Sequence, residues 1–448
     1  MIRNELVIVG GSAGGVQAAI CAQKHQRLKD IIVIRPEKKI LVPCGIPYIY
    51  GTLGNVEKNI MPDKLLGDAK LNNGKVASID RKAKTVTLED GEAIGYNKLI
   101  LATGSNPVEP PIPGADKSNV WFVRKDFDYL EQLASAIDSA KHIVVIGGGF
   151  IGVEFADECH KQGPEVTIVE LLDHCLQLIC PEQLCVRVED ALRDRGVKVA
   201  TSNAVKSIGG ADKVEFVVLG NGEKIECDMV IIGIGVRPNT KLAEEAGLEI
   251  GPTRGIKVDE FQRTTDPNIF AVGDCAEKYS FFNSAPVPLR LAAIATREGK
   301  IAAANLYSPQ WRNVGTLGVF SSIVGETAIS VAGLTDAQAA EIGYHDIVVG
   351  EAEAASKHPG TMPGAEPMRV RLIFARKSGK LLGGCACCAM TAGEFSNILA
   401  ACIVNGMTME QVALFPMGTH PWLTASPLAY QLTDAASNAL HKAKGVAA

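Results

Sequence analysis

Two segments of the chain repeat one design, and this repeat constrains the fold more than any other feature. "ELVIVGGSAGGVQAAICAQ" (5–23) and "HIVVIGGGFIGVEFADECH" (142–160) each join an apolar run to a glycine-rich turn and a helical pattern, and a second β-rich run follows each copy. This order of elements begins the βαβ unit that binds a dinucleotide. One such turn is a weak signal, but two in the same context are strong. The sequence therefore predicts an α/β chain with two Rossmann-like dinucleotide-binding domains.

The second glycine turn has the complete spacing of a dinucleotide-binding turn. Gly147 and Gly149 let the backbone turn and approach a pyrophosphate, and Gly152 lets the helix pack close to the strand. Glu170 ends the next strand, where a carboxylate accepts hydrogen bonds from a ribose diol and repels a 2′-phosphate. We therefore expect this unit to prefer NADH over NADPH. The alternative is that Glu170 is a solvated acid at a strand end.

The first glycine turn departs from this pattern at its middle position, where a serine replaces a glycine. Its residues, in order, are Gly10, Ser12, Gly14 and Gly15. Glu37 follows the next strand and is a candidate for contact with a ribose. Arg35, at the end of that strand, is either a solvated residue or a group that faces an adenine or a phosphate.

Composition narrows the class of protein. The 448 residues are 47% hydrophobic and carry a net charge of −5 with acids and bases interleaved, so no nucleic-acid or anionic-membrane surface is predicted. No apolar run reaches the length of a membrane span, and glycines break the N-terminal run too early for a signal peptide. The 12 cysteines are too sparse for a disulfide scaffold and fit a reducing cytosol. We expect a cytoplasmic protein of two or three domains.

Three strand-to-turn motifs lie between and after the repeats: "ATGSNP" (102–107), "GVRPN" (235–239) and "FAVGDCAE" (270–277). The last places Asp274 on a turn after an apolar strand, where its carboxylate can bind a polyol chain. Together with both glycine turns, these motifs make the whole chain resemble the pyridine nucleotide-disulfide oxidoreductases. The resemblance implies an FAD-binding domain (1–116 and 241–310), an NAD(H)-binding domain (117–240) and a C-terminal α+β interface domain (311–448) that forms a homodimer.

The resemblance also implies which residues lie at the cofactors, FAD and NADH, with NADPH as an alternative to NADH. They are Gly10, Ser12, Gly14, Gly15, Glu37, Pro43, Thr103, Gly104, Gly147, Gly149, Gly152, Glu154, Glu170, Gly235 and Asp274. Glu154 would lie near the nicotinamide and the flavin, although a carboxylate on a helix surface explains it nearly as well.

Cys44 stands alone in the phrase "ILVPCGIPYIYG" (40–51). Family members with a dithiol have a second cysteine five residues later, where this chain has Ile49. Cys44 therefore resembles the single redox cysteine of the branch with coenzyme A-disulfide reductases, sulfur and persulfide reductases, and NADH oxidases and peroxidases. Pro47 suits the first turn of a helix, so Cys44 is expected at a helix N-terminus, which favours a thiolate. The alternative is a buried structural cysteine.

Ala13 discriminates within this branch. NADH oxidases and peroxidases resemble one another in carrying a histidine at this position, so its replacement favours a reductase of disulfides, persulfides or polysulfides. The segment after Cys44 is shorter than is usual for the family, so we expect polysulfide or a persulfide to be a better substrate than coenzyme A disulfide. The alternatives are an NADH oxidase that reduces dioxygen, a reductase of a protein electron carrier, and a redox-sensing dimer.

The C-terminal phrase "MGTHPWLTASPLAY" (417–430) contains two candidates for proton transfer. The resemblance implies that this loop reaches the partner subunit's flavin and cysteine, with His420 at the place of an acid–base histidine. Tyr430 is a second candidate for the same task. A surface or capping histidine is the alternative reading of His420.

Two further cysteine groups lack the spacing of a metal or iron–sulfur site, so no metal is predicted. They are Cys175, Cys180 and Cys185, and Cys385, Cys387 and Cys388. Because Cys385 and Cys387 share one face of an alternating strand, core packing explains them. A metal or a secondary thiol relay is the less favoured alternative.

Overall fold

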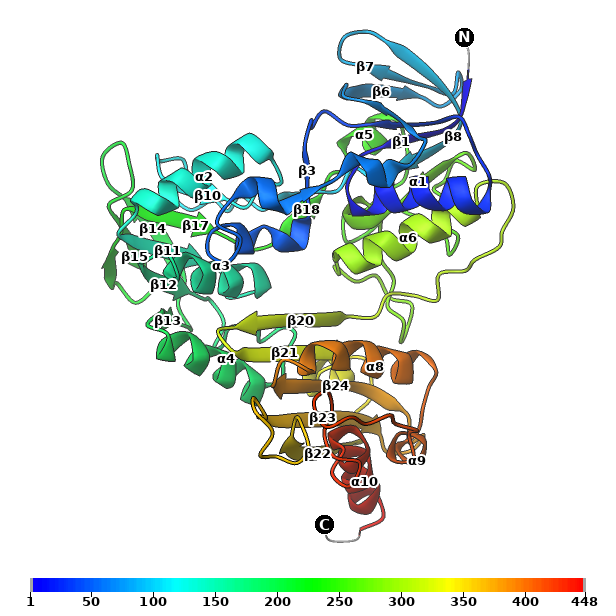
Figure 1. Ribbon diagram of the computed structural model, residues 1–448. Helices are drawn as coiled ribbons and strands as arrows, with labels where there is room; N and C mark the ends of the chain where they lie inside the picture. The colour runs from blue at the N-terminus through cyan, green and yellow to red at the C-terminus, as the bar shows by residue number, and fades with distance from the viewer. Residues whose placement is uncertain (1–2, 446–448) are drawn as a thin grey trace. The chain divides into compact units, whose positions relative to one another are not determined.

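The computed structural model describes residues 3–445, which divide into two compact units (Figure 1). Unit 1 contains the described chain up to Pro111, Trp121–Ala140 and Gly233–Thr316; unit 2 contains Ile112–Val120, Lys141–Ile232 and the described chain from Leu317 on. The first glycine turn lies in unit 1. The second glycine turn and the C-terminal region share unit 2.

Unit 1 is built on a sheet whose strands are linked by α1 and by short helical turns. Its elements are β1 (Arg3–Val9), α1 (Ala13–His25), β2 (Ile31–Ile34), β3 (Ile40–Leu41), η1 (Pro43–Gly45), η2 (Pro47–Ile49), η3 (Val56–Asn59), β4 (Ile60–Met61), η4 (Asp63–Leu66), β5 (Lys70–Asn72), β6 (Val76–Asp80), β7 (Thr85–Leu88), β8 (Ala93–Leu101), β9 (Ser105–Pro107), α2 (Phe127–Ser139), β18 (Val236–Pro238), α5 (Lys241–Glu245), β19 (Ile269–Ala271), η5 (Gly273–Cys275) and α6 (Ala292–Ala304). The short strand β10 (Val120–Phe122) crosses the division between the units.

The parallel part of this sheet has the order β5-β2-β1-β8-β19. β8 pairs with β1 on one side and with two strands on the other: its first residues pair antiparallel with β7, and Leu99–Leu101 pair parallel with β19. The central strands are almost wholly buried, as apolar runs in a parallel sheet should be. α1 packs against α6, and a Cβ on Gly299 would lie 2.5 Å from the carbonyl oxygen of Gly14. The two helices therefore cross at a pair of glycines.

Unit 2 contains a second parallel sheet and a separate antiparallel sheet. Its elements are β11 (His142–Ile146), α3 (Phe150–His160), β12 (Glu165–Val169), α4 (Glu182–Asp194), β13 (Lys198–Ala200), β14 (Val205–Gly209), β15 (Phe216–Leu219), β16 (Lys224–Glu226), β17 (Met229–Ile232), β20 (Val319–Val324), β21 (Thr327–Gly333), α7 (Asp336–Glu341), β22 (Ile347–Ala355), β23 (Pro367–Ala375), β24 (Leu381–Cys388), α8 (Ala392–Val404), α9 (Met409–Ala413) and α10 (Gln431–Ala443).

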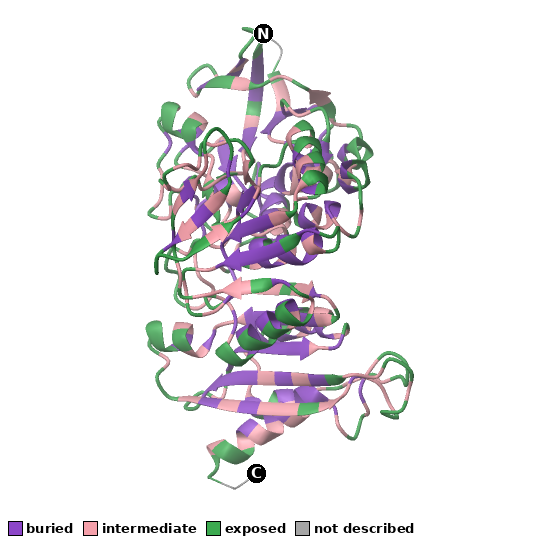
Figure 2. Cartoon of the chain, turned by 90° about the vertical axis from the view of Figure 1, so that its left-hand side faces the viewer, coloured by how far each residue is buried: buried purple, intermediate pink, exposed green. Residues whose placement is uncertain are grey.

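The parallel strands of unit 2 follow the order β17-β11-β12-β13, and α3 connects β11 to β12 as a βαβ unit requires. The antiparallel sheet has the order β20-β21-β24-β23-β22. α8 packs against β21 and β24, and α10 packs against β22 and β23. Most residues of β21, β23 and β24 are buried (Figure 2). The α/β fold class with two Rossmann-like units and a C-terminal α+β region is therefore confirmed.

The described residues contain no helix that is both long and apolar enough to cross a membrane. The predicted boundaries of the FAD, NAD(H) and interface domains stay a prediction, because the two compact units do not correspond to them one to one.

Candidate cofactor and thiol sites

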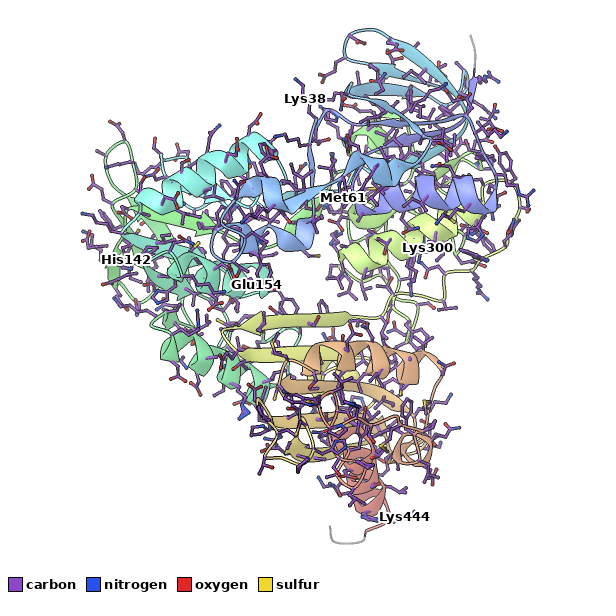
Figure 3. All side chains as sticks on the ribbon, in the orientation of Figure 1. Lys38, Met61, His142, Glu154, Lys300 and Lys444 are labelled. Carbon is purple, nitrogen blue, oxygen red and sulfur yellow. The ribbon has the colours of Figure 1, made fainter. Side chains whose placement is uncertain are left out.

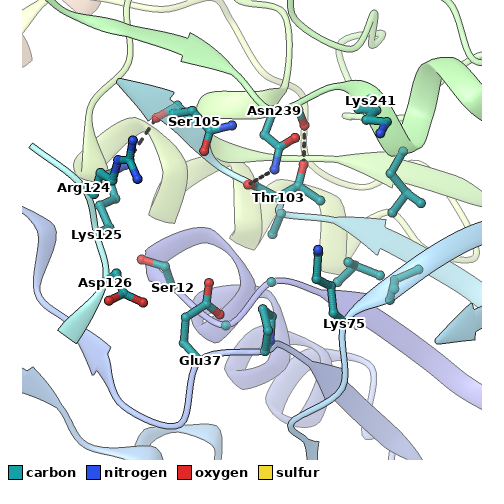
Figure 4. Close-up of a pocket in the computed structure, with 18 of the residues that line it drawn as sticks. Ser12, Glu37, Lys75, Thr103, Ser105, Arg124, Lys125, Asp126, Asn239 and Lys241 are labelled. Atoms are coloured by element: carbon teal, nitrogen blue, oxygen red, sulfur yellow. Dashed lines mark hydrogen bonds between the residues drawn. The ribbon is translucent and has the colours of Figure 1, made fainter. Parts of the chain in front are cut away.

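The first candidate site is a cavity of about 1000 Å³ inside unit 1. Its wall combines the first glycine turn, the end of β2, the turn after β8, the segment before α2, and the start of α5 (Figure 4). These segments are far apart in the chain, but the carboxyl ends of β1, β2 and β8 lie along one edge of the sheet. Ligands of open parallel sheets bind at this edge.

The first glycine turn brings the backbone close to this cavity. Gly10 has a φ of +108°, and a Cβ there would overlap the carbonyl group of Ala102. Gly15 lies in α1, and a Cβ there would overlap the carbonyl oxygen of Gly10. Ser12 is the N-cap of α1, its side chain makes no capping hydrogen bond, and it lines the cavity. The first N–H groups of a 13-residue helix therefore begin at the cavity wall, as a pyrophosphate site requires.

Glu37 and Arg35 differ in what they face. Glu37 lines the cavity, where its carboxylate can accept a hydrogen bond from a ribose. Arg35 is 2% exposed, and its guanidinium lies 2.5 Å from Asp63. Its aliphatic part packs under the glycine turn, since a Cβ on Gly11 would lie 2.6 Å from Arg35 Cδ. The idea of a solvated Arg35 was therefore wrong, because this side chain fills the space beneath the turn.

The segments "ATGSNP" and "GVRPN" pair with each other in the folded chain. β9 pairs antiparallel with β18, and the Thr103 hydroxyl donates a hydrogen bond of 2.7 Å to the carbonyl oxygen of Asn239. The N–H of Asn239 in turn donates to the carbonyl oxygen of Gly104. These bonds fix the cavity wall after β8. Gly235, directly before β18, has a φ of +105°.

Asp274 lies on η5 and contacts Ser105 and Lys125 of the cavity wall. One carboxylate oxygen accepts hydrogen bonds from Ser105 (2.7 Å) and Lys125 (3.1 Å). Burial alone would raise the pKa of Asp274, but the charge of Lys125 and the hydrogen bonds of Ser105 and Lys125 lower it overall. The carboxylate is therefore held ionised beside two residues that line the cavity.

A buried ion pair supports the same turn. Lys278 Nζ lies 3.0 Å from Glu298 Oε2, and both side chains are at most 1% exposed. Lys278 also donates to the carbonyl oxygens of Gly273 and Ala276, and Glu298 accepts from the N–H of Gly273. The pair therefore ties α6 to the backbone on either side of Asp274.

Several polar residues of the cavity wall were not predicted. They are Lys75, Arg124, Lys125, Asn239 and Lys241, all of which line the cavity (Figure 4). Arg124 and Lys125 come directly before Asp126, which caps α2 by accepting a hydrogen bond from the N–H of Tyr129. The capping pattern predicts the helix start. Only the folded chain shows that the two cations before it reach the cavity.

Cys44 is exposed in a rigid turn next to the cavity wall. It lies in η1, directly after Pro43, which lines the cavity. The Asn59 side chain donates to the carbonyl oxygen of Val42, and a Cβ on Gly45 would overlap the Asn59 amide. Pro47 does begin a helix, but η1 and η2 are single turns of three residues. The expected stabilisation of a thiolate by a full helix dipole therefore has no support here, and the alternative of a buried structural cysteine is wrong.

The second glycine turn, in unit 2, has the expected backbone. Gly147 has a φ of +108°, and a Cβ on Gly152 would overlap the carbonyl oxygen of Gly147. Gly149 is the N-cap of α3, and its backbone is extended. The carboxylate of Glu170 accepts hydrogen bonds from the N–H groups of Gly148 and Leu172. Glu170 is therefore a positioned acid at the end of β12 and not a freely solvated one.

Glu154 lies on α3 and is half-buried (Figure 3). It accepts a hydrogen bond of 2.7 Å from the hydroxyl of Ser322 on β20. This bond gives Glu154 a structural partner within unit 2. Whether it also contacts a nicotinamide stays a prediction.

The two C-terminal candidates differ in exposure. His420 is exposed, and its Nδ1 accepts a hydrogen bond from the N–H of Trp422, so the proton of the neutral ring lies on Nε2. Tyr430 is 8% exposed, its ring packs against Phe395, and burial raises its pKa. A role in proton transfer stays a prediction for both residues.

Residues 4–299 match the family model of the pyridine nucleotide-disulphide oxidoreductases, and residues 319–428 match the dimerisation domain of the same family. The chain belongs to the pyridine nucleotide-disulphide oxidoreductase family. This match confirms the family that the two glycine turns and the motifs "ATGSNP" and "FAVGDCAE" predicted. The chain is therefore a pyridine-nucleotide-dependent oxidoreductase.

Relatives within this family carry different activities in their names. The chain is 32% identical to an NADH oxidase of Methanocaldococcus jannaschii over 87% of each chain. It is 28% identical to a CoA-dependent NAD(P)H sulfur oxidoreductase of Pyrococcus abyssi over 85% of this chain and 86% of the relative. A solved NAD-dependent persulfide reductase from A. fulgidus superposes with a TM-score of 0.91 at 28% identity, over 98% of this chain and 84% of that one.

FAD and NAD(P)H are the cofactors of this family. The residues of unit 1 fit a flavin dinucleotide. The glycines let a ligand approach the backbone at the N-terminus of α1, and the volume of the cavity lies at the upper end of the usual range for ligand pockets. The second glycine turn offers backbone N–H donors at the start of α3, and Glu170 is an acceptor at the end of β12, as a site for a nicotinamide dinucleotide requires.

Proposed function

We propose that this oxidoreductase uses NADH to reduce a sulfur–sulfur bond at Cys44, in a disulfide, persulfide or polysulfide. The observation that carries the proposal is the exposed Cys44 in a fixed turn next to Pro43 of the cavity wall. Ala13 supports it, since no histidine stands in the first glycine turn to donate a proton to a peroxide. The sulfur oxidoreductase and persulfide reductase among the relatives support the substrate class.

In this proposal the cavity of unit 1 holds FAD. Ser12 and the N–H groups of α1 would bind its pyrophosphate, Glu37 would bind a ribose, and the turn of Thr103 and Asp274 would hold the polyol chain. When bound, FAD supplies a two-electron carrier between NADH and the thiol. Arg124 and Lys125 add positive charge to the cavity wall, which favours an anionic ligand.

Cys44 acts as the nucleophile. Its thiolate attacks one sulfur of the substrate, a new bond forms between that sulfur and Cys44, and the other sulfur leaves as a thiolate or sulfide. Two electrons and one proton then break the new bond, release the second thiol and restore the Cys44 thiolate. The turn held by Asn59 limits the motion of the sulfur during both steps.

His420 is our candidate for the proton donor in a homodimer. Its Nε2 carries the transferable proton, and the loop around it exposes four large apolar side chains that a partner subunit would cover. They are Leu414, Trp422, Leu423 and Leu428, each at least 51% exposed. Lys357 and His358 anchor this loop, since Lys357 lies over the Trp422 ring and His358 contacts Thr424.

An NADH oxidase is the second candidate function, favoured by the relative from Methanocaldococcus jannaschii. Mass spectrometry of the holoenzyme after polysulfide treatment, without NADH and without air, distinguishes the two. We expect added sulfur on Cys44 that disappears when NADH is supplied. Unmodified Cys44 under these conditions would favour the oxidase.

A further inference from the structure

The vicinal pair Cys387–Cys388 has a geometry that an ordinary strand does not give. Neighbouring side chains of a strand point to opposite faces, so two adjacent thiols should lie far apart. Cys388, the last residue of β24, instead has a φ of +96°, and the two sulfur atoms lie 3.1 Å apart. A positive φ in a residue other than glycine is costly and is concentrated at functional sites.

A cation faces the second of these thiols. Arg187, on α4, donates a hydrogen bond of 2.8 Å to Cys388 Sγ. Two other arginines nearby are neutralised by acids: Arg369 pairs with Glu351, and Arg371 pairs with Asp336 and Glu351. In the part of the chain that the structure describes, no carboxylate forms an ion pair with Arg187. The group that faces its guanidinium is therefore the sulfur of Cys388.

The two thiols consequently differ in protonation. The pKa of Cys388 is lowered overall: the hydrogen bond with Cys387 lowers it, burial opposes this shift, and the charge of Arg187 adds to the lowering. The same hydrogen bond and burial raise the pKa of Cys387. Cys388 is thus the nucleophile, and Cys387 keeps its proton. Burial raises the pKa of the neighbouring Cys385 to about 12, so this thiol stays inert.

A cavity of about 60 Å³ gives access to Cys387, while Cys388 lies outside its lining and is half-buried rather than fully covered. Arg187 and Cys387 both line it, together with Arg369, Arg371 and Cys385. This volume is about twice the share of one water molecule in the liquid (~30 Å³), so a molecule as small as hydrogen peroxide fits.

We propose that Cys387 and Cys388 form a second thiol centre, separate from Cys44, which hydrogen peroxide oxidises to a vicinal disulfide. The Cys388 thiolate attacks one peroxide oxygen, the O–O bond breaks, and Cys388 sulfenic acid and hydroxide form. The Cys387 thiol then attacks the sulfenic sulfur and releases water. In total, two thiols lose two electrons and two protons, and peroxide becomes two water molecules. Two equivalents of a small thiol reverse the change.

The test uses the holoenzyme with Cys44→Ser, so that oxidation of Cys44 contributes nothing. After limited peroxide treatment, alkylation of free thiols and proteolysis after Glu353 and Glu394, we expect the 354–394 fragment to lack two hydrogen atoms and to carry one alkyl group, on Cys385. With Cys387→Ala we expect a sulfenic acid on Cys388 that dimedone traps. With Cys388→Ala the fragment should keep its thiols. Two alkylated thiols at 387 and 388 after treatment, or the same loss of hydrogen in Cys388→Ala, would overturn the proposal.

The role of Arg187 has its own readout. The charged groups around Cys388 are Arg187 on α4 and Glu353 on β22; the backbone of Arg369 on β23 also forms a hydrogen bond with it, and Cys387 lies beside it. We expect Arg187→Gln to raise the pH midpoint of Cys388 alkylation and to slow its oxidation at least severalfold. Arg193→Gln on the same helix, whose guanidinium pairs with Glu189 and Asp190, is the matched control and should change neither. An unchanged midpoint in Arg187→Gln would contradict the assignment.

Discussion

Lys125 Nζ lies 3.1 Å from Asp274 Oδ2, and this contact joins the segment before α2 to the turn after β19. Without Lys125, the carboxylate of Asp274 would lose its ion-pair partner at the wall of the proposed FAD site. We therefore expect Lys125→Ala to weaken FAD binding by roughly 1.5–3 kcal/mol, the usual value of a hydrogen bond to a charged group. Titration of the flavin-free protein with FAD, followed by flavin fluorescence, measures the dissociation constant. Lys125→Arg should retain most of the affinity, and equal affinities for Lys125→Ala and the unmodified protein would refute the role.

The same contact predicts a dependence of stability on pH. Because Lys125 and Ser105 lower the pKa of Asp274 in the folded protein, this carboxylate stabilises the fold at pH values above its unfolded pKa. That contribution is lost as the pH falls through the lowered pKa. We expect Asp274→Asn to reduce the acid-induced loss of stability, as measured by thermal unfolding of the flavin-free protein over a pH series. An acid limb identical to that of the unmodified protein would show that Asp274 does not contribute.

Glu298 should matter chiefly for stability. Glu298→Ala would leave Lys278 buried without a counter-charge, which costs roughly 3–5 kcal/mol. Urea unfolding of the flavin-free protein measures the change in the free energy of unfolding. The double variant Lys278→Met with Glu298→Leu removes both charges and should be much less destabilised than Glu298→Ala. Similar losses for the two variants would show that packing, and not the ion pair, is what Glu298 supplies.

Glu170 should set the preference between the nucleotides. Its carboxylate lies at the end of β12, bonded to the second glycine turn, where it would repel a 2′-phosphate. We expect kcat/KM to be higher for NADH than for NADPH. In Glu170→Ala we expect the ratio of these two kcat/KM values to fall by a factor that corresponds to roughly 1–3 kcal/mol, the usual cost of a polar group left unpaired. Steady-state kinetics with both nucleotides measure this ratio. Equal values in the unmodified enzyme would contradict the assignment.

Local patterns in the sequence predicted the fold and the glycine turns, because a strand, its glycine turn and the following helix form one local motif of about 30 residues. The family and the fold class are confirmed on this basis. What the patterns could not supply are contacts between distant segments. The burial of Arg35 beneath Gly11 and the bond of Lys125 with Asp274 depend on how the loops fold over the sheet edge.

The thiol sites illustrate the same limit. The proline after Cys44 correctly predicted a helical start, but the sequence did not show that each helix would end after one turn. The alternating pattern placed Cys385 and Cys387 on one face of β24. It could not predict the positive φ of Cys388, because that angle depends on how the strand ends and on the contact with α4.

The rate of anaerobic NADH oxidation with polysulfide, compared between the unmodified enzyme and Cys44→Ser, tests the central claim most directly. A sulfur substrate needs the Cys44 thiolate, whereas dioxygen can accept electrons without it. We predict that Cys44→Ser loses polysulfide-dependent and coenzyme A disulfide-dependent turnover while its slow oxidation of NADH in air survives. Cys402→Ser, at a buried cysteine, is the matched control and should keep both activities. Polysulfide reduction by Cys44→Ser at the rate of the unmodified enzyme would contradict the account.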